Sequence, residues 1–190
     1  MNDSRTFVCM TDTVWGLLGL LNEIAYQKIY NIKSRDRDKP LILFAKDIKT
    51  VRKYTDEWTS EIEKIALSYW PGALTIILKR SDKLPSWLNP EFTHIGFRIP
   101  DSKSCQKIME LSTEGLLLST SANSSGEEPI KSFQEAQEKF GNQVDLILQP
   151  SPDEIFSDIA STIIKLSDQK IEILRQGAIS KSDIDKFRIH

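Results

Sequence analysis

The chain alternates between short apolar runs and longer segments in which apolar residues recur at every third or fourth position. The short runs, bounded by polar or turn-forming residues, are typical of strands, and the wider spacing is typical of helices. Strands are predicted at 5–10, 41–45, 74–78, 95–99, 145–148, 161–166 and 171–175, with one more beginning at Leu116. Helices are predicted at 22–32, 60–69, 102–111 and 132–141, the last closed by Gly141.

Three of these helices begin at residues that favour helix capping. Asn22 precedes the first helix, and an asparagine side chain can accept a hydrogen bond from the free N–H groups of a first turn. Ser60 with Glu63, and Ser132 with Glu135, form Ser-x-x-Glu sequences typical of a capping box. These residues predict where the helices start.

The order of the elements indicates the fold class. Strands and helices interleave, but neighbouring strands are often close enough to form hairpins, as the last two are around 167–169. This mixture favours an α/β (α+β) protein, with helices packed on a mixed sheet, over the parallel order of a Rossmann fold. No repeat or linker divides the 190 residues, so a single domain over 1–190 is predicted.

Composition and charge narrow the function classes. Apolar residues make up 39% and charged residues 27%, and the net charge of −2 gives no general attraction to nucleic acid or an anionic membrane. The longest apolar run, 14–21, is too short for a membrane span, and Asp3 and Asp12 flank it where a signal peptide carries basic residues. We therefore expect a cytoplasmic protein without membrane contact.

The sequence lacks the motifs of several common metal-binding, nucleotide-binding and catalytic sites. Cys9 and Cys105 have no metal-binding spacing, so neither a zinc site nor a disulfide framework is predicted, and Cys105 is expected to be buried filler. Neither GxxxxGK[ST] nor GxGxxG occurs, and the histidines are His94 and His190. The sequence does contain many cationic and hydroxyl side chains, which are suited to positioning a polyanion.

The stretch NIKSRDRDKP is the first candidate site. It carries four cations, Lys33, Arg35, Arg37 and Lys39, just past the predicted end of the first helix. Cations there could complement the helix dipole, with the intervening aspartates neutralising the run. They could equally bind an anion, and Pro40 then anchors the loop to the following strand. The pattern alone leaves both interpretations open.

The stretch STSANSSG at a strand end is the second candidate. Ser119 and Ser121 share one face of the strand, followed by Asn123 and the turn 124–126. Hydroxyls, an amide and backbone N–H groups could form a neutral cradle for phosphate or carboxylate, or a purely structural turn. Arg98, in the otherwise apolar strand IGFRI, requires a partner if it is buried, and a carboxylate is the natural one. The stretch TDTVWG, with one threonine on each side of an aspartate, is a further candidate, but taken alone it is weak evidence for a binding site.

Taken together, the blocks resemble a known family. TDTVWGL, KSR followed by KPLIL, YWPGALTIIL, IGFRIPD, STSANSSG, STII and ILRQGAI occur in the order found in the YrdC/Sua5 family of threonylcarbamoyl-AMP synthases. The resemblance implies a twisted mixed sheet with a deep, positively charged cavity. It also implies a reaction, in which L-threonine, bicarbonate and ATP give threonylcarbamoyl-AMP and pyrophosphate. This is the first step of N6-threonylcarbamoyladenosine formation at position 37 of tRNAs reading ANN codons.

The resemblance also implies roles for residues. Lys33 and Arg35 are the implied catalytic pair. Implied ATP contacts are Lys33, Arg35, Lys39, His94, Ser121, Asn123, Pro129 and Arg175, and implied L-threonine contacts are Thr13, Arg98, Ser119 and Ser161. ATP enters as a substrate with Mg²⁺, without a tightly bound cofactor and without metal ligands from the chain. Phe44 stands where the family often has a histidine, and His94 where threonine is usual.

The likeness is to the short, single-domain form of the family, with residues 180–190 as a short C-terminal tail. Implied partners are a downstream threonylcarbamoyl-transferase complex and, weakly, tRNA. Two alternatives stay open at this point. One is an RNA-binding module without catalysis, which the pI near 5.8 disfavours. The other is handling of carbamoyl adenylate, as in hydrogenase-maturation proteins.

Overall fold

The computed structural model describes residues 3–123, 127–167 and 170–187. The strands are β1 (Thr6–Met10), β2 (Trp15–Leu20), β3 (Ile42–Ala45), β4 (Leu74–Lys79), β5 (His94–Arg98), β6 (Leu116–Ser121), β7 (Leu146–Ile147), β8 (Thr162–Ser167) and β9 (Lys170–Arg175). The helices are α1 (Glu23–Lys33), α2 (Ile48–Tyr54), α3 (Ser60–Tyr69), α4 (Lys103–Met109), α5 (Phe133–Phe140) and α6 (Lys181–Asp185).

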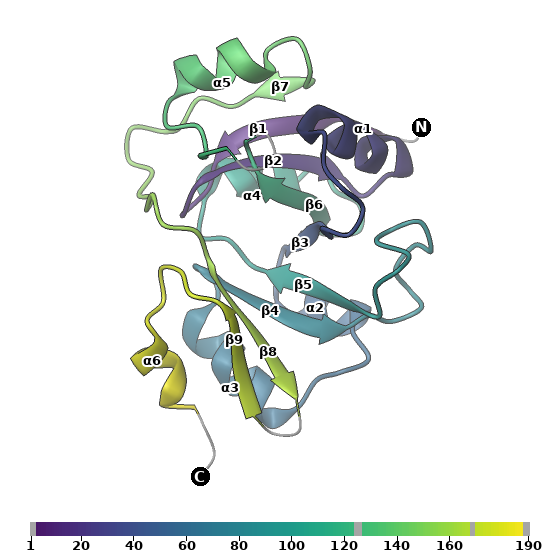
Figure 1. Cartoon of the computed structure of the whole chain (residues 1–190), viewed down its shortest axis with the longest axis vertical. Coiled ribbons are helices and arrows are strands. Elements are labelled where there is room, and N and C mark those ends of the chain that lie inside the picture. The colour runs from purple at the N-terminus through teal and green to yellow at the C-terminus, as the bar shows by residue number, and fades with distance from the viewer. Residues whose placement is uncertain (1–2, 124–126, 168–169, 188–190) are drawn as a thin grey trace.

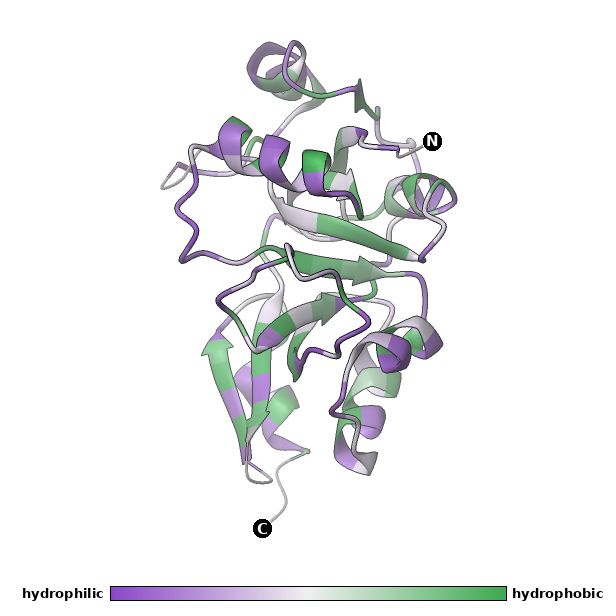
Figure 2. Cartoon of the chain, turned by 90° about the vertical axis from the view of Figure 1, so that its right-hand side faces the viewer, coloured by the Kyte–Doolittle hydropathy of each residue, from purple (hydrophilic) through white to green (hydrophobic). Residues whose placement is uncertain are grey.

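All the described strands join one twisted sheet in the order β7-β1-β2-β6-β3-β5-β4-β8-β9 (Figure 1). Three neighbouring pairs, β1–β7, β3–β5 and β4–β8, are parallel, and the other pairs are antiparallel. The predicted mixed sheet is therefore confirmed. Figure 2 shows apolar residues concentrated along the central strands, while the helices also carry polar residues.

Helices cover both faces of the sheet around β1. Val8 packs in the main core with Ala25 and Ile29 of α1, whereas Cys9 packs in a second apolar cluster with Cys105 of α4. Both cysteines are free and buried, as expected for Cys105. Every residue of β1 and β2 is buried as a result. Burial on both faces explains why these strands have continuous apolar sequences.

Three elements, β2, α2 and α6, were missed from the sequence, and one cap was assigned wrongly. β2 falls in the apolar run 14–21, which lacks the alternation of a half-buried strand, and α2 is a short helix capped by Asp47. The N-cap of α3 is Thr59, not Ser60, because the Thr59 hydroxyl accepts the Ile62 N–H. Asn22 and Ser132 cap α1 and α5 as predicted.

The C-terminal part is anchored to the sheet. β8 and β9 pair antiparallel as predicted, although 168–169 of their turn lie outside the described residues, as does the predicted turn at 124–126. Within the segment predicted as a tail, α6 buries Ile184, and the Tyr69 hydroxyl donates a hydrogen bond to the Asp183 carbonyl at 3.0 Å. In the described residues, no helix has the length and apolar character to cross a membrane.

Candidate active site

A cavity of about 420 Å³ is lined by residues in or next to β2, β3, β5, β6, β8 and β9. Segments far apart in the sequence meet there: the β1–β2 turn, the loop after α1, β6, and the start of β8 with the end of β9. Eight predicted site residues line it, namely Thr13, Arg35, Lys39, Arg98, Ser119, Ser121, Ser161 and Arg175. The fold thus brings the two candidate stretches and Arg98 to one site.

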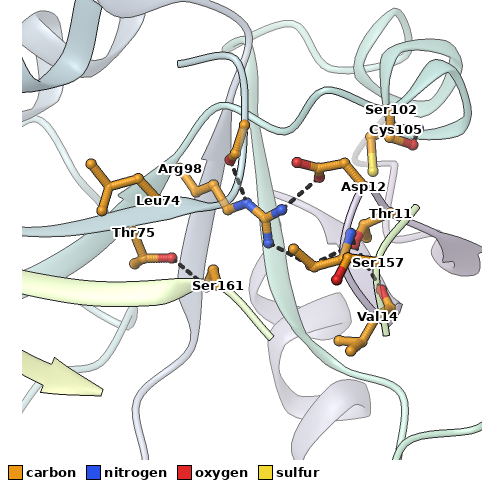
Figure 3. Close-up of polar contacts among 12 residues, drawn as sticks. Thr11, Asp12, Val14, Leu74, Thr75, Arg98, Ser102, Cys105, Ser157 and Ser161 are labelled. Carbon is orange, nitrogen blue, oxygen red and sulfur yellow. Dashed lines mark hydrogen bonds and ion pairs between the residues drawn. The ribbon is translucent and has the colours of Figure 1, made fainter. Parts of the chain in front are cut away.

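Arg98 is buried at the end of β5 and is held by three residues of two segments, Gly72 ahead of β4 and the β1–β2 turn. Its Nε donates to the Gly72 carbonyl at 2.9 Å, and its Nη1 to Thr13 Oγ1 at 2.9 Å. Its Nη2 lies 2.5 Å from Asp12 Oδ1, and Figure 3 shows the Asp12 carboxylate pointing at the guanidinium. The carboxylate partner expected for a buried Arg98 is therefore Asp12, a residue that sequence analysis did not assign. These contacts use three of the five guanidinium N–H donors.

Hydroxyl groups gather around Arg98. Thr13 Oγ1 lies 3.0 Å from Thr11 Oγ1, which also donates to the Val14 carbonyl at 2.7 Å. Ser161 Oγ lies 2.9 Å from Thr75 Oγ1 and accepts a hydrogen bond from Arg175 Nη2 at 3.0 Å. This part of the cavity offers neutral donors and acceptors beside one buried guanidinium, a combination suited to a small zwitterion or carboxylate.

Cations form the other part of the lining. Arg35 donates from Nε to the Lys39 carbonyl at 2.9 Å, from Nη2 to the Pro40 carbonyl at 3.2 Å and from Nη1 to Thr120 Oγ1 at 3.4 Å. Its side chain therefore shapes the loop and reaches β6. The final carbonyls of α1 accept instead from the Ser34 and Arg35 backbone N–H groups. This geometry does not favour the helix-dipole interpretation of Arg35.

Two of these cations have lowered pKa values, and the acidic Asp38 also lines the cavity. Desolvation lowers the pKa of Arg35 below its ordinary value. Arg175 has a lowered pKa for the same cause, reinforced by the positive charge of Arg98. An anionic ligand would relieve both effects by supplying the opposite charge. In the described chain no group of three or more His, Cys, Asp or Glu side chains could hold a metal ion.

Lys33, a predicted catalytic residue and ATP contact, is buried against the end of β6. Its side chain is 1% exposed, and its Nζ lies 2.5 Å from the Ser121 carbonyl, 2.5 Å from the Asn123 carbonyl and 2.9 Å from Asn123 Oδ1. An ammonium group has three N–H donors, and these acceptors use them all. Lys33 is not among the lining residues, and through these contacts it holds the end of β6 and the adjoining Asn123.

Three more predicted residues lie outside the lining. The Asn123 side-chain amide donates to the carbonyl of Glu127, two residues ahead of Pro129, at 2.7 Å. His94 begins β5, where its Nδ1 lies 2.9 Å from Thr93 Oγ1. Desolvation lowers the pKa of His94, and the nearby charge of Lys165 adds to the effect.

Gly177 is predicted to be essential for the shape of this site. A Cβ at this position would lie 2.2 Å from the Ala160 carbonyl oxygen and 2.5 Å from the Ser161 carbonyl carbon. Gly177→Ala would have to displace that backbone, and we expect a loss of about 1–3 kcal/mol in the free energy of unfolding. Denaturant titration would measure it, with Ala178→Ser, at the exposed neighbouring position, as the control. An unchanged unfolding midpoint would contradict the prediction.

The family model Sua5_yciO_yrdC, described as telomere recombination, matches residues 1–177. The chain belongs to the Sua5/YciO/YrdC family. A Methanocaldococcus jannaschii relative is 36% identical over 179 residues, 93% of this chain and 82% of its own length. The threonylcarbamoyl-AMP synthase of Pyrococcus abyssi is 30% identical over 95% of this chain, and this chain covers 54% of its length.

Solved structures agree with the family assignment. Pyrococcus abyssi Sua5 complexed with L-threonine superposes with a TM-score of 0.88 at 29% identity, over 96% of this chain and 53% of Sua5. The chain thus spans about half the length of the Pyrococcus abyssi proteins it matches. Escherichia coli YciO, at 23% identity, shares the fold with a TM-score of 0.82, over 98% of this chain and 87% of its own. The predicted family resemblance is confirmed.

Proposed function

We propose that this chain is an L-threonylcarbamoyl-AMP synthase, a nucleotidyltransferase that converts L-threonine, bicarbonate and ATP into threonylcarbamoyl-AMP and pyrophosphate. The observation that carries the proposal is that one cavity lining combines the buried Arg98 and its hydroxyl neighbours with two further cations, Arg35 and Arg175. The relatives' printed names, and the L-threonine complex of Pyrococcus abyssi Sua5, support it.

The proposed reaction needs no covalent nucleophile from the chain. The threonine amine and bicarbonate combine, with loss of water, to give N-carboxythreonine. A carbamate oxygen then attacks the α-phosphorus of ATP, the new P–O bond forms, and the bond to pyrophosphate breaks. The protein contributes by holding the reactants in line, balancing the charge on the departing pyrophosphate and keeping water from the mixed anhydride.

The lining residues suggest how this work is divided. We assign the threonine carboxylate to Arg98, with Thr13, Ser119 and Ser161 as hydroxyl neighbours. The nucleotide phosphates are assigned to the cations Arg35, Lys39 and Arg175 of the lining, with Ser121 as a neutral donor. Lys33 and Asn123 would support the end of β6. His94 and Pro129 stay predicted nucleotide contacts, and ATP would enter with Mg²⁺ as a substrate.

The test is incubation of the purified chain with labelled threonine, bicarbonate and Mg-ATP, followed by chromatography for threonylcarbamoyl-AMP and an assay for pyrophosphate. Omission of bicarbonate is the control. The proposal predicts both products in equal amounts.

Salt-sensitive tRNA binding without ATP turnover would favour the RNA-binding alternative instead. Adenylate formed only from carbamoyl phosphate would favour the carbamoyl-adenylate alternative. A transferase complex that modifies tRNA would consume the product.

The buried ammonium of Lys33 predicts a pH dependence of this activity. Burial, followed in size by the charge of Arg35, lowers the pKa of Lys33 from 10.5 to about 8. The neutral amine has one N–H donor fewer for the acceptors at the end of β6. The turnover number kcat is therefore expected to fall as the pH rises through about 8.

The stability effect of Lys33 has the opposite sign. Below pH 8 both the folded and the unfolded chain carry the proton, and between 8 and 10.5 only the unfolded chain keeps it. The contribution of Lys33 to the free energy of unfolding therefore rises over that interval, so unfolding of this origin cannot cause the loss of kcat. In Lys33→Met, kcat should be low and should lack the step near pH 8. A wild-type kcat that stays level from pH 7 to 10 would contradict the prediction.

A further inference from the structure

Asp12 lies in the turn between β1 and β2 and forms a nearly buried ion pair with Arg98. The Nη2–Oδ1 distance is 2.5 Å, and the side chains of Arg98 and Asp12 are 4% and 10% exposed. Its neighbours Thr11 and Thr13 line the cavity, but Asp12 is not part of the described lining. The carboxylate therefore contacts Arg98 from outside the lining (Figure 3).

The turn that carries Asp12 is fixed on several sides. The Ser157 N–H donates to the Asp12 carbonyl at 3.1 Å, and the Thr13 N–H donates to Thr11 Oγ1 at 3.1 Å. The Ser102 hydroxyl donates to the Met10 carbonyl at 3.1 Å. A carboxylate on such a turn has a defined position, and it can impose that position on the guanidinium it binds.

The Asp12–Arg98 ion pair also offsets positive charge near Arg175. Arg98 is close enough to Arg175 for its charge to help lower the pKa of Arg175. Without Asp12, Arg98 would be a buried cation next to another cation, and it would gain by turning toward solvent. The carboxylate offsets one charge and opposes that movement.

We infer that Asp12 is a positioning residue, which orients Arg98 so that its remaining N–H donors meet the carboxylate of threonine. The inference rests on the proposed function, because it concerns the substrate of that same site. Asp12 lies outside the cavity lining and pairs with Arg98, so it would act on a ligand through Arg98. Its loss should therefore affect threonine and spare ATP.

The opposite effect of Asp12 on threonine binding has to be distinguished from positioning. Asp12 could compete with the substrate carboxylate for Arg98, in which case its removal would tighten threonine binding. We favour positioning, because the Asp12 bond uses one N–H donor and the contacts with Gly72 and Thr13 use one each. Two donors are left over from these contacts for a ligand carboxylate.

The experiment compares Asp12→Ala and Asp12→Asn with the wild type, by KM for threonine and ATP and by calorimetric binding of threonine. Asp12→Ala is expected to raise the threonine KM and Kd about tenfold and to leave the ATP KM within about twofold. Asp12→Asn keeps an oxygen acceptor without the charge, so its effect should be smaller. Asp3→Asn, in the exposed ion pair with Arg5 ahead of β1, is the matched control.

A double-mutant cycle separates positioning from general damage to the fold. If Asp12 acts through Arg98, Asp12→Ala should have no further effect on threonine binding in an Arg98→Ala background. Additive losses in the cycle, equal losses for ATP and threonine, or a lowered threonine Kd would each overturn the inference. Circular dichroism melts identify the temperature range in which all variants are folded.

The two proposals can fail separately. A wild type that makes threonylcarbamoyl-AMP, together with an Asp12→Ala variant of unchanged threonine affinity, overturns the inference and supports the proposed function. A wild type that binds threonine but makes no adenylate overturns the proposed function. In that case the calorimetric Kd values alone decide the role of Asp12.

Discussion

Replacement of Arg98 by alanine is expected to raise the threonine KM by about ten- to a hundredfold while the ATP KM stays within about twofold. A hydrogen bond to a charged group contributes roughly 1.5–3 kcal/mol, and Arg98 is the buried guanidinium beside the hydroxyl groups. Steady-state kinetics with each substrate varied in turn measures the two effects. Arg5→Ala, which removes an exposed guanidinium ahead of β1, is the control.

The same change leaves Asp12 as a nearly buried carboxylate without its cation. Removing one partner of a buried pair typically destabilises a protein by about 3–5 kcal/mol, so the melting temperature should fall as well. Kinetics must therefore be measured below the transition of the variant. Equal losses for threonine and ATP in the folded variant would show that Arg98 does not select threonine.

Arg35→Lys is expected to reduce kcat at least about tenfold, which corresponds to roughly 1.4 kcal/mol of transition-state stabilisation. The fork of Arg35 reaches two loop carbonyls and Thr120, and lysine can copy neither its planar geometry nor its number of donors. Loss of the fork should loosen the loop and misplace the charge that we assign to pyrophosphate. Single-turnover measurement of adenylate formation would isolate this step.

Arg37→Lys is a matched control for Arg35→Lys. Arg37 lies in the same basic loop but is exposed, and its guanidinium packs over the Tyr30 ring at 4.2 Å from the centroid. It is not among the residues that line the cavity, so this change should leave kcat near the wild-type value. A fully active Arg35→Lys enzyme, or one that is inactive because it has unfolded, would remove the catalytic role assigned to Arg35.

Local interactions explain what could be predicted from the sequence. Asn22 and Ser132 cap helices by bonds to N–H groups two or three residues away, so the nearby sequence specifies those starts. The strand 116–121 carries its hydroxyl groups at its own end, and the basic loop directly follows α1. A Ser-x-x-Glu sequence was less reliable, because Thr59 lies next to Ser60 and can cap equally well.

The site itself depended on contacts between distant segments. Asp12 meets Arg98 across 86 residues, and Lys33 meets the Ser121 and Asn123 carbonyls across 88 and 90 residues. No spacing along the chain encodes such pairs, because they form only when the sheet order places β5 and β6 beside their partners. Sequence alone therefore indicated Arg98 as a buried cation that required a partner and Lys33 as one of four basic residues. The tertiary structure decided that Asp12 is the partner, and that Lys33 binds backbone carbonyls outside the cavity lining. It also decided that β2, buried on both faces, is a strand, since a strand covered on both sides loses the alternation by which a sequence reveals it.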